Sequence, residues 1–215
     1  MRLIGMLDSP YVRRVAIALQ LLEFPFEHDP LSVFGTFEQF SRINPVVKAP
    51  TFVCDDGTVL MDSALIIDHL EAVAGRSLWP AALAERTRAL RVTGLALAAC
   101  EKVMQIVYEH HLRPAEKLHA PWLARVTGQM TAALTALDAE IARHPPAATQ
   151  ATLGQDGLCA AIAWRFMQIK LEVPVADAAC PALAAHSARA EALPAFRSTP
   201  ADDTVSVSTP GYKAP

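Results

Sequence analysis

The periodicity of apolar residues changes once along this chain of 215 residues, at Trp79-Pro80. Before that point, short apolar runs alternate with helical stretches and turn residues, which is typical of a small α/β unit. After it, every patterned stretch has helical spacing, and the clearest stripe consists of Trp122, Val126, Met130, Leu134, Leu137 and Ile141. The sequence therefore predicts an α/β domain over residues 1–76, an all-helical domain over residues 84–199 and a tail over residues 200–215.

The first domain begins with an apolar run at residues 2–7, which reads as a central strand covered on both faces. A helix starts at Pro10, because proline is favoured in the first turn and the apolar residues that follow have helical spacing. Residues 26–29 form a second strand. A helix that connects two neighbouring strands of one sheet makes them parallel, so we expect a parallel pair.

The second half of this domain has a different pattern of predicted elements. A short helix within residues 34–43 precedes a hairpin over residues 51–61 with an Asp-Gly turn. Ser63 then caps a helix that stops at Gly75. The predicted order is β-α-β-α-β-β-α.

The helical domain opens with one long helix over residues 81–113, with a possible bend at Gly94. Thr152 and Gln155 fit a capping box at the start of a later helix, because the Thr hydroxyl and the Gln amide can each bond a free backbone N–H. A last helix spans residues 181–193. We see no internal repeat.

Composition excludes several classes of protein. The formal net charge of −3 and a pI near 6.1 offer no general attraction to a phosphate backbone, so no nucleic-acid partner is expected. No apolar run approaches the roughly 18 residues that span a bilayer, and the start lacks a signal-peptide pattern, so we expect no membrane association and a cytoplasmic protein. Because 52% of the residues are hydrophobic, a buried subunit interface is expected.

Cysteine and histidine spacing gives no metal motif. The cysteines lie far apart without C-x-x-C, and we read them as reduced core thiols: Cys54, Cys100, Cys159 and Cys180. The seven histidines show no H-E-x-x-H or Cys/His ligand spacing, so no metal is predicted.

Ser9 follows the first strand at the start of the first helix. A hydroxyl there lies beside free backbone N–H groups and the positive end of the helix dipole, an environment that favours an anion and lowers the pKa of a thiol. The alternative is a plain N-cap, which Ser followed by Pro fits equally well.

Two further segments fall at connections of the same domain. A proline such as Pro50 at the mouth of a strand, when cis, turns the N–H and C=O of Ala49 outward toward a peptide-like ligand; the alternative is an ordinary trans proline. Asp62-Ser63 offers a hydroxyl and N–H groups to a carboxylate and a carboxylate to an ammonium, with a plain helix cap as the alternative.

The order and spacing of these segments resemble the cytosolic glutathione transferases. In that family the thioredoxin-like first domain has the same element order, a Ser, Tyr or Cys after strand one, a cis-proline before strand three and a Glu/Asp-Ser pair opening helix three. The string NPVVKAPTF at residues 44–52 is similar to the family's N-P-x-G-K-V-P-T-L, with Val47 in place of the usual glycine. The helical second half matches too, so the resemblance covers residues 1–199.

The resemblance implies a role for each matching residue. Ser9 would donate a hydrogen bond to the sulfur of glutathione, the cosubstrate, and Ala49 would pair its backbone with the cysteinyl part. Asp62 and Ser63 would hold the γ-glutamyl end, and Lys48 would reach the glycine carboxylate or stay a solvated surface charge. The pocket for a small hydrophobic electrophile would use Tyr11, Met104, Tyr108 and Trp164, each of which can equally be a core residue. A homodimer is implied.

Three classes of function stay open. The leading one is a glutathione transferase that adds the thiol to small hydrophobic electrophiles. The same site would also serve a glutathione-dependent isomerase or a peroxide or disulfide reductase. A non-catalytic binding or regulatory module with this fold is the third, whereas a thioredoxin-type oxidoreductase is disfavoured by the missing C-x-x-C.

Overall fold

The computed structural model describes residues 1–201 of the chain. By their contacts these residues divide into two compact units: a first unit, Met1–Leu78 joined by the segment from Ala192 onward, and a second unit, Trp79–Glu191. Residues 192–199, which the sequence analysis grouped with the helical domain, thus belong by contacts to the first unit. Of the predicted tail, residues 202–215 lie outside the described residues.

The first unit is built on a sheet of four short strands in the order β2-β1-β3-β4. They are β1 (Arg2–Ile4), β2 (Glu27–Asp29), β3 (Thr51–Val53) and β4 (Val59–Met61). β1 runs parallel to β2 and antiparallel to β3, and β3 and β4 form the predicted hairpin. β1 lies inside the sheet with Leu3 and Ile4 fully buried, so the predicted central strand and the parallel pair are confirmed.

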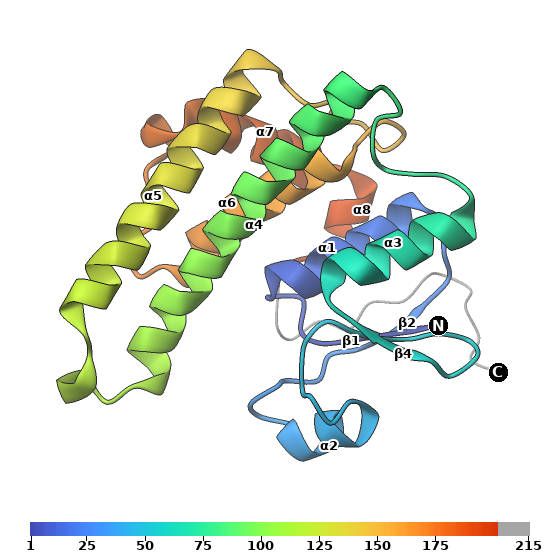
Figure 1. Cartoon of the computed structure of the whole chain (residues 1–215), viewed down its shortest axis with the longest axis horizontal. Coiled ribbons are helices and arrows are strands. Elements are labelled where there is room, and N and C mark those ends of the chain that lie inside the picture. The colour runs from blue at the N-terminus through green and yellow to red at the C-terminus, as the bar shows by residue number, and fades with distance from the viewer. Residues whose placement is uncertain (202–215) are drawn as a thin grey trace. The chain divides into compact units, whose positions relative to one another are not determined.

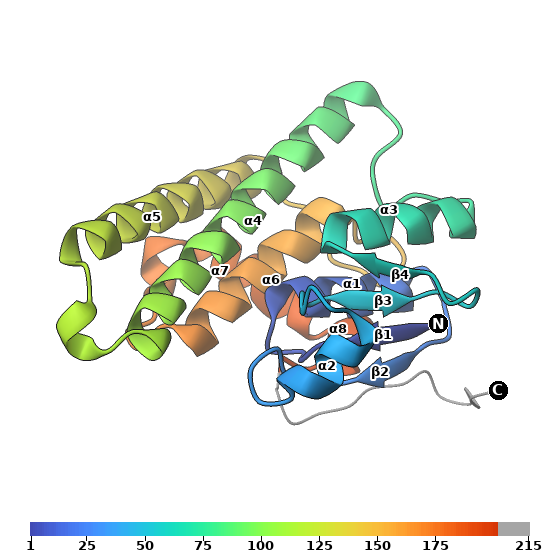
Figure 2. The same cartoon turned by 60° about the horizontal axis from the view of Figure 1, so that its bottom comes forward.

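Helices cover both faces of this sheet (Figures 1 and 2). Helix α1 (Pro10–Leu21) and helix α3 (Ser63–Ala74) pack together on one face, and the short α2 (Phe37–Ile43) lies on the other. The core between them consists of fully buried side chains, among them Leu3, Val15, Leu19, Phe52, Ile66 and Leu70. The apolar positions of α1 are buried as their helical spacing predicted, and most of the other residues of this helix are buried too.

Helix α8 (Pro194–Arg197) packs against α1, and it was not predicted from the sequence. The guanidinium of Arg13 on α1 donates from Nε to the carbonyl of Thr199 at 2.8 Å and lies 5.3 Å from the ring centroid of Phe196. These contacts explain why the segment from Ala192 groups with the first unit.

The second unit is all helical, as predicted. Its helices are α4 (Leu83–Leu112), α5 (Ala120–Arg143), α6 (Gln155–Lys170) and α7 (Pro181–Glu191), with two 3-10 turns, η1 (Ala115–Lys117) and η2 (Asp177–Ala179). The stripe on α5 is buried from Val126 to Ile141, whereas Trp122 at its start is 39% exposed. Arg91 of α4 donates to Glu140 of α5 at 2.9 Å, and the α7 amide of Leu183 donates to Asp138 of α5 at 2.8 Å.

Several predicted local features are wrong. The first strand ends at Ile4 rather than near residue 7, because Gly5 has φ = +134°, and a Cβ there would lie 2.6 Å from Cγ2 of Val12. The chain must turn sharply at Gly5 to bring α1 back onto β1. The N-cap of α3 is Asp62, not Ser63, with the Asp62 carboxylate accepting from the Ala64 N–H at 2.9 Å.

The third is the capping box. The N-cap of α6 is Gly154, which has no side chain to bond the helix, and Thr152 instead pairs its hydroxyl with that of Thr149 at 2.5 Å. The predicted last helix ends at Glu191, two residues early. Pro194 then starts α8 as a separate turn.

Across residues 1–201, no helix combines the length and the hydropathy that crossing a lipid bilayer would require. In the same described part of the chain, no three His, Cys, Asp or Glu side chains gather where they would hold a metal ion.

Candidate functional site

Ser9 lies in the connection between β1 and α1, directly before the helix, and its side chain is partly buried. It is the N-cap of α1, with extended backbone angles, and its Oγ accepts from the Val12 N–H at 3.5 Å, a long bond. Pro10 occupies the first turn, as predicted. A hydroxyl has one proton to donate besides its acceptor lone pairs. The cap therefore leaves the Ser9 O–H available to a ligand, and the two readings of Ser9 are compatible.

The second segment is the loop that leads into β3. The Ala49-Pro50 peptide bond is cis. Within residues 1–201 no hydrogen bond uses the backbone N–H or C=O of Ala49. Since backbone polar groups that are shielded from water need partners, these two groups are candidates to pair with an extended ligand.

A buried polar pair holds this loop in place. The Asn44 amide donates to the Thr51 hydroxyl at 2.8 Å, and that hydroxyl donates to the Lys48 carbonyl at 2.7 Å. Asn44 and Thr51 are 2% and 0% exposed, so the loop is fixed from inside. Val47 has φ = +51°, a left-handed conformation that is costly for a β-branched residue. This conformation explains why a glycine would suit position 47. The Lys48 side chain is exposed.

The third segment begins α3. Asp62 has φ = +73°, another left-handed non-glycine residue, and its side chain is exposed. Ser63 is 5% exposed, and its Oγ accepts from Nη1 of Arg14 at 3.2 Å. A strained residue that the surroundings hold in place is a feature that clusters at ligand sites.

These three segments meet around the first turns of α1. Ser9 caps the Val12 N–H, and a Cβ on Gly5 would touch both Val12 and the Cβ of Ala49, the latter at 3.1 Å. Ser63 reaches α1 one turn further on, through Arg14. Each of the three segments thus has a contact near the start of α1, through Val12, Gly5 or Arg14.

Arg14 is the residue that the sequence analysis missed. Arg13 and Arg14 are 2% and 3% exposed, although two consecutive arginines on a helix normally face water. The first turn of α1 contains no acidic residue, although Asp8 directly precedes Ser9 and Asp62 precedes Ser63. In the sequence, Arg13 and Arg14 are two charged residues beside an apolar stripe, and this pattern does not indicate that their side chains are buried.

The side chain of His28 on β2 bonds the turn between β1 and α1. Its Nε2 donates to the Gly5 carbonyl at 2.7 Å, and burial of the ring lowers the pKa of His28 below its ordinary value. The neutral ring is therefore the form that fits this position.

The residues predicted for an electrophile lie in different places. Tyr11 directly follows Pro10 in α1 and is partly buried. Met104 is partly buried and Tyr108 is 39% exposed on α4, whereas Trp164 on α6 is only 5% exposed. The last three belong to the second unit.

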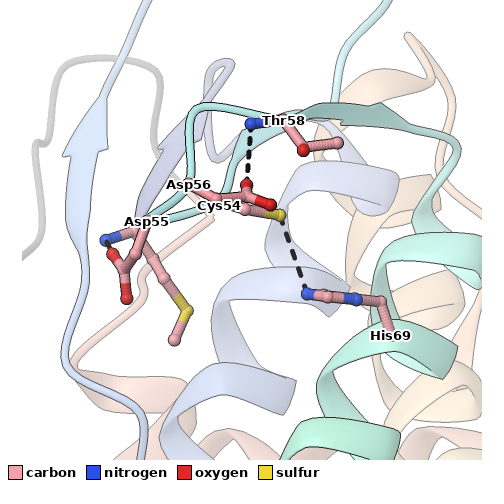
Figure 3. A network of polar contacts seen from close by, with 6 residues as sticks. Cys54, Asp55, Asp56, Thr58 and His69 are labelled. Carbon is pink, nitrogen blue, oxygen red and sulfur yellow. Dashed lines mark hydrogen bonds and ion pairs between the residues drawn. The ribbon is translucent and has the colours of Figure 1, made fainter.

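Cys54 is not the core thiol that the sequence predicted. The four cysteines are free and three are buried, but Cys54 is partly exposed at the end of β3. Figure 3 shows its sulfur directed at His69 of α3, with Sγ and Nε2 3.6 Å apart. Burial, together with Asp56 and Asp55 in the adjoining turn, raises the pKa of the Cys54 thiol. The thiol form therefore prevails at neutral pH, which gives Cys54 little nucleophilic character.

The fold is a thioredoxin-like domain with a mixed four-stranded sheet, followed by a helical domain. Residues 3–77 match the family model of the glutathione S-transferase N-terminal domain. A glutathione S-transferase from Methylobacterium radiotolerans JCM 2831, solved in complex with glutathione sulfonate, is 28% identical. The match covers 92% of this chain and 93% of the transferase, with a TM-score of 0.76. Residues 3–77 are therefore a glutathione S-transferase N-terminal domain, and the chain as a whole is similar to glutathione transferases.

Two further proteins are similar to this chain. Maleylpyruvate isomerase from Pseudomonas aeruginosa PAO1 is 25% identical with a TM-score of 0.69, and the match covers 99% of this chain and all of that one. The uncharacterized GST-like protein YibF of Escherichia coli K12 is 25% identical over 139 residues, 64% of this chain and 68% of YibF.

Proposed function

We propose that this protein activates the thiol of glutathione for attack on small hydrophobic electrophiles, with the Ser9 hydroxyl donating a hydrogen bond to the sulfur. The observation that carries the proposal is the position of Ser9. Its Oγ caps α1 through a long bond to the Val12 N–H, and its proton can be donated to a ligand beside the positive end of the helix dipole.

The size of this effect suits the chemistry. A free thiol with a pKa of about 8.5 is only about 3% thiolate at pH 7, and lowering that pKa by about 1.5 units makes it half ionised. Such a shift requires roughly 2 kcal/mol of differential stabilisation of the thiolate. One charge-assisted hydrogen bond contributes about 1.5–3 kcal/mol, and the helix N-terminus adds to it.

The remaining groups would orient glutathione. The unpaired backbone of Ala49 would bond the cysteinyl residue as an added strand, in front of the cis Pro50. The Asp62 carboxylate would hold the γ-glutamyl ammonium, and Ser63 would hold its carboxylate. The buried Arg14 guanidinium, 3.2 Å from the Ser63 hydroxyl, would position that hydroxyl and favour the negative charge. Lys48, exposed beside Ala49, would meet the glycine carboxylate.

Related proteins support glutathione as the cosubstrate, because the relative from Methylobacterium radiotolerans was solved with glutathione sulfonate bound. We keep Tyr11, Met104, Tyr108 and Trp164 as the candidates for contact with the electrophile. A homodimer in the cytoplasm, where glutathione is abundant, is the expected working form.

The test is calorimetric titration with glutathione, followed by turnover of a chromogenic aryl halide, for the wild-type protein, Ser9→Ala and Ser9→Thr. We expect Ser9→Ala to bind glutathione and turn over slowly, and Ser9→Thr, which keeps a hydroxyl, to recover part of the rate. A wild-type protein that does not bind at millimolar glutathione would overturn the proposal and favour a non-catalytic module.

A second candidate is glutathione-dependent isomerisation. It is favoured by the likeness to maleylpyruvate isomerase, which extends over 99% of this chain. The same thiolate would add to a conjugated double bond, allow rotation and leave again, so glutathione would be regenerated. Conversion of maleylpyruvate that needs glutathione without consuming it would establish this activity, and conjugation of the aryl halide alone would exclude it. Reduction of a peroxide or disulfide would instead consume glutathione and yield its disulfide.

A further inference from the structure

The side chains of Cys54 and His69 come from different elements of the first unit and face each other. Cys54 directly follows β3, and His69 lies in the second turn of α3. Their Sγ and Nε2 atoms are 3.6 Å apart, and Figure 3 shows the sulfur directed at the ring. Both residues are partly exposed, so the pair is accessible from solvent. Thiolate sulfur and imidazole nitrogen are common ligands of zinc in proteins.

The distance between the two atoms suits one bridging cation. A zinc ion lies about 2.3 Å from a thiolate sulfur and about 2.0–2.1 Å from an imidazole nitrogen, and tetrahedral angles then hold the sulfur and the nitrogen about 3.5 Å apart. The observed 3.6 Å between Sγ of Cys54 and Nε2 of His69 is close to this separation. Small rotations about the side-chain bonds therefore bring both lone pairs onto one ion without a change in the backbone.

Carboxylates in the adjoining turn favour a cation at this place. Burial and, after it, the negative charges of Asp56 and Asp55 raise the pKa of the Cys54 thiol. The Asp55 carboxylate is paired with the N-terminal ammonium of Met1. The Asp56 carboxylate accepts from the Thr58 N–H at 2.9 Å, a bond that lowers the pKa of Asp56 and keeps it ionised. The same negative charge that holds a proton on the sulfur attracts a divalent cation.

The pair forms an open set of ligands. Within residues 1–201, no third His, Cys, Asp or Glu side chain completes it, so water would fill the remaining coordination positions. The sequence does not indicate such a site, because the two residues are 15 positions apart and meet only when the hairpin packs against α3. An open pair of this kind binds a cation reversibly and more weakly than a closed set of four ligands.

This pair is separate from the proposed glutathione site, although both lie in the first unit. β3 starts at Thr51, beside the cis Pro50, and Cys54 follows its other end, about 10 Å away at the rise of an extended strand. Likewise, Ser63 begins α3, and His69 is about 9 Å further along the helix axis. A cation at the pair therefore does not depend on bound glutathione, and its test is independent of the proposed function.

We propose that Cys54 and His69 form a binding site for one thiophilic divalent cation of the zinc type. The cation bonds to Sγ and Nε2 and replaces the proton that lies between them, so one proton leaves to solvent for each cation bound. Nothing is oxidised or reduced in this exchange.

The test is calorimetric titration of the full-length protein with zinc chloride, without glutathione, whose own thiol would compete for the metal. Titrations in two buffers that differ in ionisation enthalpy count the protons released. Cys54→Ser and His69→Gln each remove one ligand. His110→Gln, at an exposed histidine of α4, is the matched control for the histidine variant, and Cys180→Ser, at a buried cysteine, is the control for the cysteine variant.

We expect the wild-type protein to bind one zinc ion per chain and to release close to one proton at pH 7.5. Loss of a group that merely supports a metal ligand costs about 10–100-fold in affinity, so each ligand variant should lose at least about tenfold. Proton release should disappear in Cys54→Ser. Both control variants should bind like the wild type, and circular dichroism should show every variant folded.

A measurement on the wild-type protein checks the site without any substitution. Cys54 is partly exposed, whereas the other three cysteines are buried, so iodoacetamide should alkylate Cys54 first. Zinc should slow this alkylation in proportion to its occupancy, as followed by mass spectrometry.

No binding of zinc at submillimolar concentration, or alkylation of Cys54 at the same rate with and without zinc, would overturn the proposal. Full affinity in Cys54→Ser, or loss of affinity in His110→Gln, would place the metal at other side chains. Loss in Cys54→Ser with full affinity in His69→Gln would show that the thiol alone binds the cation, and would equally refute the pair.

Discussion

The two units of this protein differ in how their backbones are held. In residues 1–201, the non-glycine residues with positive φ are Glu23, Val47 and Asp62, and the glycines with positive φ are Gly5, Gly57 and Gly75. Every one of them lies in the first unit. The second unit is built from helices with regular backbone, and apolar stripes and a few polar bonds such as Arg91–Glu140 join those helices.

Each unit also buries one histidine in the same way. His28 donates to the Gly5 carbonyl in the first unit, and His186 donates to the Gly157 carbonyl in the second, at 2.7 and 2.8 Å. Both units therefore bury a histidine ring through a hydrogen bond to a glycine carbonyl, whereas only the first unit uses residues with positive φ. The first unit therefore holds its turns and loops in left-handed conformations, at a cost in local conformational energy for the non-glycine residues, while the second unit is a packed helical bundle.

The largest effect is expected at Gly5. Gly5→Ala places a Cβ 2.6 Å from Val12 at φ = +134°, and we expect a loss of about 3 kcal/mol or more in the free energy of unfolding. Gly94→Ala in α4 is the matched substitution in the second unit, where nothing lies within 4 Å of the new Cβ. There we expect a gain of about 1 kcal/mol, because alanine favours a helix.

Denaturant unfolding monitored by circular dichroism measures both changes. Equal effects of the two substitutions would remove the contrast between the units.

Ser9→Ala should slow turnover of the aryl halide about fifteenfold at pH 7, because the glutathione thiol would return to a pKa of about 8.5. The deficit should shrink as the pH rises through 8.5, where the thiol ionises unaided. The pH–rate profile of kcat/KM is the measurement. A deficit that is constant from pH 6 to 9 would show that Ser9 acts on something other than thiol ionisation.

Stability should fall as the pH drops below the ordinary histidine value of 6.5. Burial lowers the pKa values of His28 and His186, so the unfolded chain binds more protons than the folded one in this range. The stabilisation from the neutral rings is thus complete above pH 6.5 and is lost on acidification. Each ring contributes a slope of up to about 1.4 kcal/mol per pH unit.

Urea unfolding at intervals from pH 7.5 to 5 tests this slope. His186→Gln keeps an amide that donates toward the Gly157 carbonyl and removes one titrating group, so its slope should be flatter than that of the wild type. A wild-type stability that does not change between pH 7 and 5 would contradict the burial of both rings.

The smallest effect is at Val47. Val47→Gly should raise the free energy of unfolding by about 1 kcal/mol, since glycine relieves the left-handed conformation at φ = +51°. Val46→Gly, at an exposed neighbour with ordinary φ, should lower it by a few tenths to 1 kcal/mol through added freedom of the unfolded chain. Thermal unfolding of the pair distinguishes the two signs. A destabilising Val47→Gly would mean that the loop tolerates valine without strain.

Much of the fold was readable from the sequence, because its signals are local. The turn at Asp56-Gly57 predicted the hairpin, Pro10 and the α5 stripe predicted their helices, and Gly75 marked the end of α3 with the expected left-handed φ of +64°. The segments around Ser9, Pro50 and Asp62-Ser63 were also readable, since each is a short string beside an element boundary.

Tertiary structure alone decided which of these groups have partners. Arg14 contacts Ser63 across 49 residues, Arg13 contacts Thr199 across 186, and the partly buried Cys54 lies 3.6 Å from His69 of α3. The burial of these guanidinium groups depends on residues that meet only after the sheet and helices pack, whereas the cap at Asp62 is a local bond to the Ala64 N–H. A sequence pattern encodes the periodicity of an element, whereas burial, φ and partner choice follow from the free energy of the whole packed unit.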